Sequence, residues 1–449
     1  MSIAVCVSLL SGRSTTFQAQ EEATIRQLRA KAQEELGIRL SQLIGSCGEV
    51  LEEERTTTQA GLRDGDSLTA LVGHDTLASS SAAFALLRAD GSVVTWGAAG
   101  DGGDCGKVRP QLRNVEEIWS TQHAFAALRT DGSVVTWGRR DAGGDSTGVW
   151  RRLHDVQSIQ GMQDLFAAKR GDGEMVIWGS RTHAWHHHRI RDRLENARQF
   201  VQGSGLACAV LLQDRSVVAW GRSDFGGDCS AVQEQLVDVK QLAATDSAFA
   251  AVRMDGHVVT WGHPRFGGDN IRLQSQLHSV QHLVASDGAF AALLEDGTVV
   301  SWGHVQCGGN SSSVQTRLRG VRELTANAGA FAALLEDGEV VTWGAETHGG
   351  VCRRVQKELK NVQRIASSSS AFAALLTDGS VVTWGDCRAG GNCNRVRKQL
   401  KNVRQLQASS NAFAAILGDG SVVTWGDPDF GGDSSCVQEQ LQAPRMPPQ

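Results

Sequence analysis

The chain has 449 residues and a formal net charge of −5, with 51 glycines, 6 prolines and no tyrosine. Hydrophobic residues make up 41% and charged residues 21%, a balance that allows a packed core and excludes global disorder. The negative charge argues against a globally basic nucleic-acid-binding protein, and no apolar run is long enough to span a bilayer. Ten cysteines form no CxxC pair, and we identify no signal peptide. We therefore expect free thiols and a cytoplasmic or nuclear protein.

The first 73 residues predict a compact α+β domain. The pattern indicates a hairpin, then a helix, then further short strands. Thr24 is placed to cap the N-terminus of the helix, and Gly37 follows its C-terminal end. A short polar linker, residues 74–81, is expected after this domain. The expected strands are Ile3–Leu10, Thr15–Gln20, Leu40–Ile44, Glu49–Leu51 and Ser67–Val72.

A 41-residue repeat fills the rest of the chain. The dipeptide Trp-Gly recurs nine times at steps of 41 residues, with a single step of 42. Repetition at a fixed period is typical of solenoids and propellers. The nine tryptophans are Trp96, Trp137, Trp178, Trp220, Trp261, Trp302, Trp343, Trp384 and Trp425.

Each unit predicts three or more short strands. In one good copy, Ala330–Leu335 and Glu339–Trp343 form a hairpin around Asp337-Gly338, a dipeptide that suits a tight turn. The segment Val362–Ala366 fits a further strand. One unit has Asp214-Arg215 in place of Asp-Gly, and we expect backbone strain there.

These units are too small to bury a core alone, so neighbouring units must stack. We predict a mainly β fold, a β-propeller of about 7–9 blades over residues 82–441, preceded by the α+β domain. Alanine-rich strands are expected near the axis, with the tryptophans packed between blades. The incomplete first and last units are expected to complement each other and close the ring. A linear β-solenoid is the alternative, and residues 442–449 are expected to be a disordered tail.

Two family resemblances carry expectations about function. The segments TIRQLRAKAQEELGI, LIGSCGEVLEEERT and GLRDGDSLTALV resemble ubiquitin-like domains over residues 1–73. That resemblance implies a β-grasp fold and places Leu10, Ile44 and Leu71 on the apolar patch by which the family binds receptors. Ubiquitin receptors or the proteasome would then be partners of this domain. The alternative is that one or more of the three residues packs in the core.

Residues 82–441 resemble the regulator of chromosome condensation repeat, in which a strand, an Asp-Gly turn and a strand end in Trp-Gly, as in AFAALLEDGEVVTWG. The short period is similar to that of a bacterial β-lactamase inhibitor with compact repeats. Large ubiquitin ligases with a HECT domain also carry such repeats, but no segment here fits a HECT domain or a RING. The resemblance implies a binding architecture more than an activity.

The variable stretches after each Trp-Gly are the best candidates for a protein-binding face, because loops on a repeated scaffold carry specificity. Arginine and aromatic residues favour interface hot spots. Solvated loop decoration is the alternative. The candidates are Arg139, Arg140, Phe225, Arg265, Phe266 and Phe430.

Other patterns favour structural explanations. The recurring Gly-Gly-Asp could suggest calcium, but local turns explain it more simply. The cluster His183–His188 could bind zinc or nickel, although tolerated loop variation is the simpler interpretation. Cys105, Cys229, Cys352 and Cys393 are expected to be free, solvent-facing thiols. We expect no metal and no cofactor.

No GxSxG, HExxH or Walker motif is present, so the chain is not expected to be an enzyme. The leading hypothesis is a protein-binding adaptor that links a propeller-bound partner to the ubiquitin pathway. The alternatives are a regulator of a small GTPase or of another enzyme, and the substrate-recognition part of a ubiquitin ligase.

Overall fold

A computed structural model describes residues 2–180, 197–203 and 206–442. The N-terminal part is one mixed sheet with strand order β2-β1-β4-β3, in which β1 is parallel to β4 and the other pairs are antiparallel. Helix α1 packs Leu28 and Ala32 against the sheet residues Val5 and Val7 in one core. The elements are β1 (Ser2–Leu9), β2 (Ser14–Gln20), α1 (Ile25–Leu36), β3 (Leu40–Ile44) and β4 (Asp66–Val72).

The ends of α1 match the sequence prediction. Thr24 accepts a hydrogen bond from the Gln27 N–H, the Gln27 side chain caps Thr24 in return, and Gly37 ends the helix in the left-handed region at φ 64°. The predicted strand at Glu49–Leu51 is wrong. That segment contributes only an isolated bridge between Val50 and Ile44.

The described residues between 76 and 426 form nine three-stranded antiparallel sheets, numbered here sheets 1 to 9 in chain order. In each sheet the second strand lies in the middle. The strands are β5 (Thr76–Ser79), β6 (Ala83–Leu87) and β7 (Val93–Gly97) in sheet 1; β8 (Val115–Ser120), β9 (Ala124–Arg129) and β10 (Val134–Gly138) in sheet 2; β11 (Val156–Gly161), β12 (Leu165–Arg170) and β13 (Met175–Gly179) in sheet 3; β14 (Ala197–Gln202), β15 (Ala207–Leu212) and β16 (Val217–Gly221) in sheet 4; β17 (Val239–Ala244), β18 (Ala248–Arg253) and β19 (Val258–Gly262) in sheet 5; β20 (Val280–Ala285), β21 (Ala289–Leu294) and β22 (Val299–Gly303) in sheet 6; β23 (Val321–Ala326), β24 (Ala330–Leu335) and β25 (Val340–Gly344) in sheet 7; β26 (Val362–Ser367), β27 (Ala371–Leu376) and β28 (Val381–Gly385) in sheet 8; and β29 (Val403–Ala408), β30 (Ala412–Leu417) and β31 (Val422–Gly426) in sheet 9.

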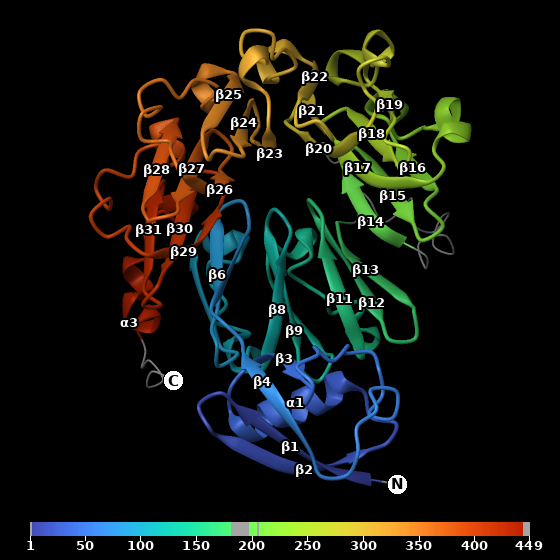
Figure 1. The fold of residues 1–449 in the computed structure, drawn as a ribbon, viewed down its shortest axis with the longest axis vertical. Helices are drawn as coiled ribbons and strands as arrows, with labels where there is room; N and C mark the ends of the chain where they lie inside the picture. The colour runs from blue at the N-terminus through green and yellow to red at the C-terminus, as the bar shows by residue number, and fades with distance from the viewer. Residues whose placement is uncertain (1, 181–196, 204–205, 443–449) are drawn as a thin grey trace.

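The nine sheets close into a ring (Figure 1). Sheet 9 meets sheet 1 through a hydrogen bond of 2.8 Å from the Ser410 N–H to the Ser81 carbonyl and one of 3.1 Å from Trp96 Nε1 to the Gly431 carbonyl. The chain end covers this junction, because Leu441 of the short helix α3 (Gln438–Leu441) is buried between the two sheets. The two incomplete ends therefore complement each other, and the linear solenoid is excluded.

The order of strands from the axis outward differs from the prediction. The strands with the Val-x-x-Leu pattern are innermost, and β17, β20, β23, β26 and β29 line a common axial cavity of about 580 Å³. The Ala-Phe-Ala-Ala strands lie in the middle of each sheet. Strands β21 and β24, for example, are apolar at every position because both faces are covered by neighbouring sheets. Thr76–Ser79, which the sequence placed in a linker, form β5, the inner strand of sheet 1.

Packing between sheets explains three repeated residue types at once. Trp137 Nε1 donates a hydrogen bond of 3.0 Å to the Gly102 carbonyl of the preceding connector, and its ring stacks on Phe125 at 5.3 Å. A Cβ at Gly102 would lie 2.5 Å from the Phe125 ring, and one at Gly103 would lie 2.3 Å from the Gly97 carbonyl oxygen. The glycine pair is therefore required by this close approach, and the predicted inter-blade role of the tryptophans is confirmed.

The irregular turn at Asp214-Arg215 is strained as predicted. Arg215 has φ 66°, whereas the equivalent residue in the neighbouring sheet is Gly256 at φ 80°. A side chain at positive φ costs roughly 1 kcal/mol or more relative to glycine.

Replacing Arg215 with glycine is expected to stabilise the chain by about 0.5–1 kcal/mol. The relief of backbone strain outweighs the destabilising effect of the extra freedom that glycine gives the unfolded chain. Equilibrium unfolding in urea would measure this change. The reciprocal variant Gly256→Arg should be destabilised, and an Arg215→Gly variant no more stable than the natural chain would contradict the strain argument.

Candidate interaction surfaces

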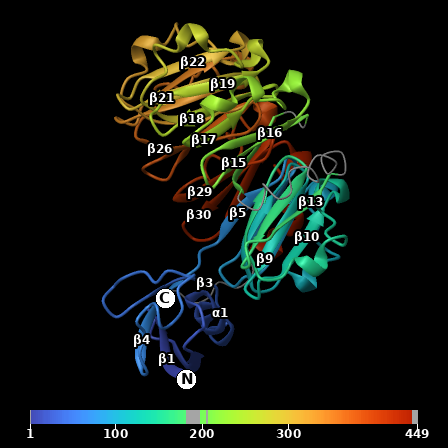
Figure 2. The ribbon, with the colours of Figure 1, turned by 90° about the vertical axis from the view of Figure 1, so that its right-hand side faces the viewer.

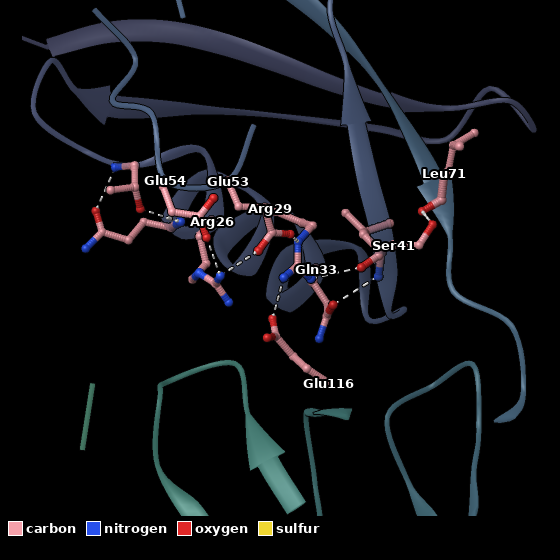
Figure 3. Close-up of polar contacts among 11 residues, drawn as sticks. Arg26, Arg29, Gln33, Ser41, Glu53, Glu54, Leu71 and Glu116 are labelled. Carbon is pink, nitrogen blue, oxygen red and sulfur yellow. Dashed lines mark hydrogen bonds and ion pairs between the residues drawn. The ribbon is translucent and has the colours of Figure 1, made fainter. Parts of the chain in front are cut away.

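One face of the N-terminal sheet is turned away from α1. On β4, Leu68 and Ala70 are buried in the core, so the alternating residue Leu71 points to the opposite face, where it is half-buried. In Figure 3, Leu71 lies beyond Ser41 and points away from Glu116 of the ring. Leu71 is therefore a surface residue of the outer face.

The other two predicted patch residues share this outer face. Ile44 lies directly opposite Thr69 in the β3–β4 ladder and is half-buried, so it projects on the same side as Leu71. Ser8 of β1 pairs with Thr69, and Leu10 follows two residues later, just after the end of β1. Leu10 is 79% exposed. The structure thus places Leu10, Ile44 and Leu71 on one side of the sheet and none of them in the core. We call these three residues the outer patch.

The opposite side of this domain rests on the ring. Arg29 of α1 is buried and forms an ion pair of 2.8 Å with Glu116 of β8 and another of 2.7 Å with Glu53 (Figure 3). The Arg39 N–H donates a hydrogen bond of 2.8 Å to the Ala89 carbonyl in the hairpin of sheet 1. Arg39 also donates from Nη1 to the Glu116 carbonyl at 2.9 Å. Charged and main-chain contacts therefore join the two parts.

This docking leaves a cavity of about 500 Å³ between the two parts, lined by α1, β3 and the inner strands of sheets 1 and 2. Arg26, Arg29 and Glu117 are among its charged residues. Burial, and next the charge of Glu116, raise the pKa of Glu117. Figure 2 shows α1 and β3 nearer to the ring than β1 and β4. The outer patch consequently faces away from the ring.

The predicted loop arginines are already engaged within the ring. Arg139 donates to Asp101 at 3.1 Å, and His123 lies 3.1 Å from the same carboxylate oxygen. Arg140 contacts Asp145 at 2.6 Å. Hydrogen bonds from Thr147 and from Arg140 lower the pKa of Asp145 to about 2, so this pair is charged at neutral pH. Arg140 remains 85% exposed and can still meet a partner.

The predicted aromatic residues are partly structural. Phe225, Phe266 and Phe430 are half-buried, and each packs against a core between two sheets. Arg222 stacks over Phe225 at 4.8 Å, while Arg265 is exposed. The six loop candidates lie on four different connectors, so the structure does not bring them together into one patch.

Two further sequence expectations have clear outcomes. The Gly-Gly-Asp aspartates form local turns, as when Asp104 accepts a hydrogen bond of 2.7 Å from the Gly106 N–H. Cys105, Cys229, Cys352 and Cys393 are free but buried, so the solvent-facing expectation is wrong. They fill the core beneath each connector instead. His183–His188 lies outside the described residues. Within the part of the chain that the structure describes, no group of three or more metal-ligating residues is found, and no helix is long and apolar enough to cross a membrane.

Sequence reasoning missed a pair of aspartates at the point where successive sheets are linked near the axis. The Asp246 N–H donates to the Asp287 carbonyl at 2.8 Å, and the Asp287 N–H donates to the Ala328 carbonyl at 3.1 Å. Burial raises the pKa of Asp246, and burial together with the charge of Asp246 raises the pKa of Asp287 to about 6. The 41-residue spacing of Asp246 and Asp287 is the signal that could have revealed the pair.

Replacing Asp287 with asparagine is expected to stabilise the chain at pH about 8 and to have no effect at pH about 4. The pKa of Asp287 is raised in the folded state. The protonated carboxyl therefore gives the natural chain its full stability below pH about 4, and this contribution is lost as the pH rises through about 6. The gain should stay below about 1 kcal/mol, since the side chain is partly exposed. Urea midpoints at both pH values would measure it, and an equal gain at both would contradict the titration.

No family model matches the chain, and no curated protein matches it. Among solved structures, yeast RCC1 (Prp20), determined bound to Kap60, is 14% identical over 76% of this chain and 88% of that chain, with a TM-score of 0.39. Human WBSCR16 is 14% identical over 51% of this chain and 76% of the WBSCR16 chain, with a TM-score of 0.36. The computationally designed Ika8 protein is 16% identical over 69% of this chain and 95% of the Ika8 chain, with a TM-score of 0.33. At this level of similarity nothing follows about the activity or partners of this chain.

Proposed function

We propose that this chain is a non-enzymatic adaptor with a ubiquitin-like N-terminal domain and a propeller of the regulator of chromosome condensation type. The outer patch would bind ubiquitin receptors or the proteasome. The connectors that follow Trp-Gly would bind a second protein. The chain would thereby bring the second protein to ubiquitin-pathway machinery.

The observation that carries this proposal is the placement of Leu10, Ile44 and Leu71. All three lie on the sheet face opposite α1, while the α1 side is occupied by the Arg29–Glu116 contact with the ring. Leu10 is exposed and Ile44 and Leu71 are half-buried, and apolar residues grouped in this way on one accessible face are typical of protein-binding surfaces. The docking also holds the patch in a fixed direction relative to the ring, which suits a connecting role.

Binding of the full chain to purified proteasomes and to a purified ubiquitin-associated domain tests the proposal. Ile44→Ala is expected to weaken binding about tenfold or more, because a central apolar contact is lost. The fold should persist, since Ile44 projects from the surface. Val237→Ala, at a 45% exposed position on the ring, is the matched control and should bind normally. Binding unchanged by Ile44→Ala, or absent in the natural chain, would overturn the proposal.

A further inference from the structure

Positive charge is concentrated on one sector of a ring whose chain is negative overall. Residues 351–404 contain eleven lysines or arginines and three acidic residues, and all eleven cations are exposed. Nine of these cations lie on two successive connectors, residues 345–361 and 386–402. The connector at residues 222–238 has a single arginine and four acidic residues, so the basic sector is not a general property of the repeat.

A groove runs between these two basic connectors. It has a volume of about 720 Å³ and is floored by β28, the outer strand of sheet 8. Arg353 and Arg354 line one side and Arg397 lines the other. The turn that carries aspartate in five units has Val351 and Asn392 here, and Val351 is 41% exposed. The groove therefore combines cationic walls with an apolar spot. We call it the basic groove.

One repeat position shows how this groove differs from its neighbours. In three other units a glutamine amide donates to the first carbonyl of the outer strand, as Gln356 does to Val340 at 3.2 Å. The equivalent residue beside β28 is Arg397, which forms an ion pair with Glu358 across the groove. A second arginine–carboxylate contact of this kind would be available to a bound acidic side chain.

The chemistry favours an acidic polypeptide over nucleic acid. The basic sector spans two connectors, while the chain as a whole is negative, which opposes a long polyanion. The residues that line the groove include one aromatic, Trp384, and it is buried, so no exposed ring is available to stack a base. Arginines in a groove suit bidentate binding of carboxylates.

We propose that the basic groove binds an extended acidic peptide segment of a partner protein, with its carboxylates on Arg354 and Arg397 and an apolar side chain near Val351. In the free protein Glu358 forms an ion pair with Arg397, and a carboxylate of the peptide displaces Glu358 on binding. This inference concerns the ring alone, and it holds or fails independently of the outer patch.

The test measures fluorescence anisotropy of a labelled peptide of about twelve residues, made of Glu, Asp and Gly with one Leu, added to the full chain. The double variant Arg354→Gln, Arg397→Gln is expected to weaken binding about tenfold or more. It should fold normally, because Gln at position 397 restores the residue found in other units. Glu358→Gln is expected to tighten binding about threefold, since it frees Arg397.

Arg272→Gln is the matched control, because Arg272 occupies the position of Arg354 on another connector, and it should bind the peptide as the natural chain does. Binding should weaken with added salt. Three results would overturn the proposal: equal binding of a Gln/Asn version of the peptide, no loss in the double variant, or tighter binding of an oligothymidylate of equal charge that the double variant abolishes. The last result would assign the groove to nucleic-acid phosphates.

Discussion

Replacing Trp302 with alanine is expected to destabilise the ring by about 4 kcal/mol. The side chain is 4% exposed, stacks on Phe290 at 5.3 Å and donates a hydrogen bond of 3.0 Å to the Gly267 carbonyl of the preceding connector. Its loss would leave a large cavity and an unsatisfied carbonyl between sheets 5 and 6. Equilibrium unfolding in guanidinium chloride would measure the effect.

Trp150 provides a matched control for this variant. It belongs to a connector and is 62% exposed, so Trp150→Ala should change the free energy of unfolding by less than about 0.5 kcal/mol. Similar losses in the two variants would show that the repeated tryptophans do not hold adjacent sheets together. A large loss for Trp302→Ala alone supports the packing scheme of every unit.

The sequence predicted what every unit shares. Nine copies of Trp-Gly at one period indicated repeated small sheets, tryptophans between them and a ring joined by its incomplete ends. The α+β character of the N-terminal segment followed from its capping residues and hydrophobic spacing. Such features can be predicted from the sequence because they depend on local geometry that is repeated, or on residue types with strong positional preferences.

The missed features depend on contacts between segments distant in sequence. Small residues suit close approach, so the sequence predicts the Ala-Phe-Ala-Ala strand at the axis. The structure uses them in the middle strand, where a neighbouring sheet covers each face. The position of the four cysteines just after the glycine pair predicts solvent-facing thiols, whereas the structure buries them in the core between sheets. The contact between Arg29 and Glu116 joins residues 87 positions apart, and nothing in the local sequence of either residue indicates it.

The ring and the N-terminal domain present their proposed binding surfaces in different ways. The outer patch is apolar and lies on a regular sheet, so its shape is set by β-strand register. The basic groove lies between two connectors, and its charge comes from the concentration of arginines and lysines on them. Arg397 stands where several other units have glutamine, whereas Arg354 has a basic counterpart in Arg272. A repeated scaffold can change such positions in one unit without disturbing the core packing shared by all nine.

Replacing Glu116 with alanine is expected to weaken the docking of the N-terminal domain on the ring by about 3 kcal/mol. The change leaves the buried Arg29 guanidinium without its partner from the ring, although Glu53 still pairs with it. Hydrogen exchange at the Arg39 N–H, which bonds to the Ala89 carbonyl, would report the loosening. Glu54→Ala is the control and should leave this exchange unchanged, because Glu54 is exposed and pairs only with Arg26 among the described contacts.

A paired replacement separates the contribution of the ion pair from that of burial. The double variant Arg29→Met, Glu116→Met removes both charges and keeps apolar volume, so it should restore most of the protection that Glu116→Ala loses. If the double variant remains as loose as the single one, the hydrogen bonds of Arg29 to Glu53 and to the Leu40 carbonyl, both within the N-terminal domain, are needed to keep the docking side of that domain in place. Unchanged exchange in Glu116→Ala would instead show that main-chain contacts alone fix the direction of the outer patch.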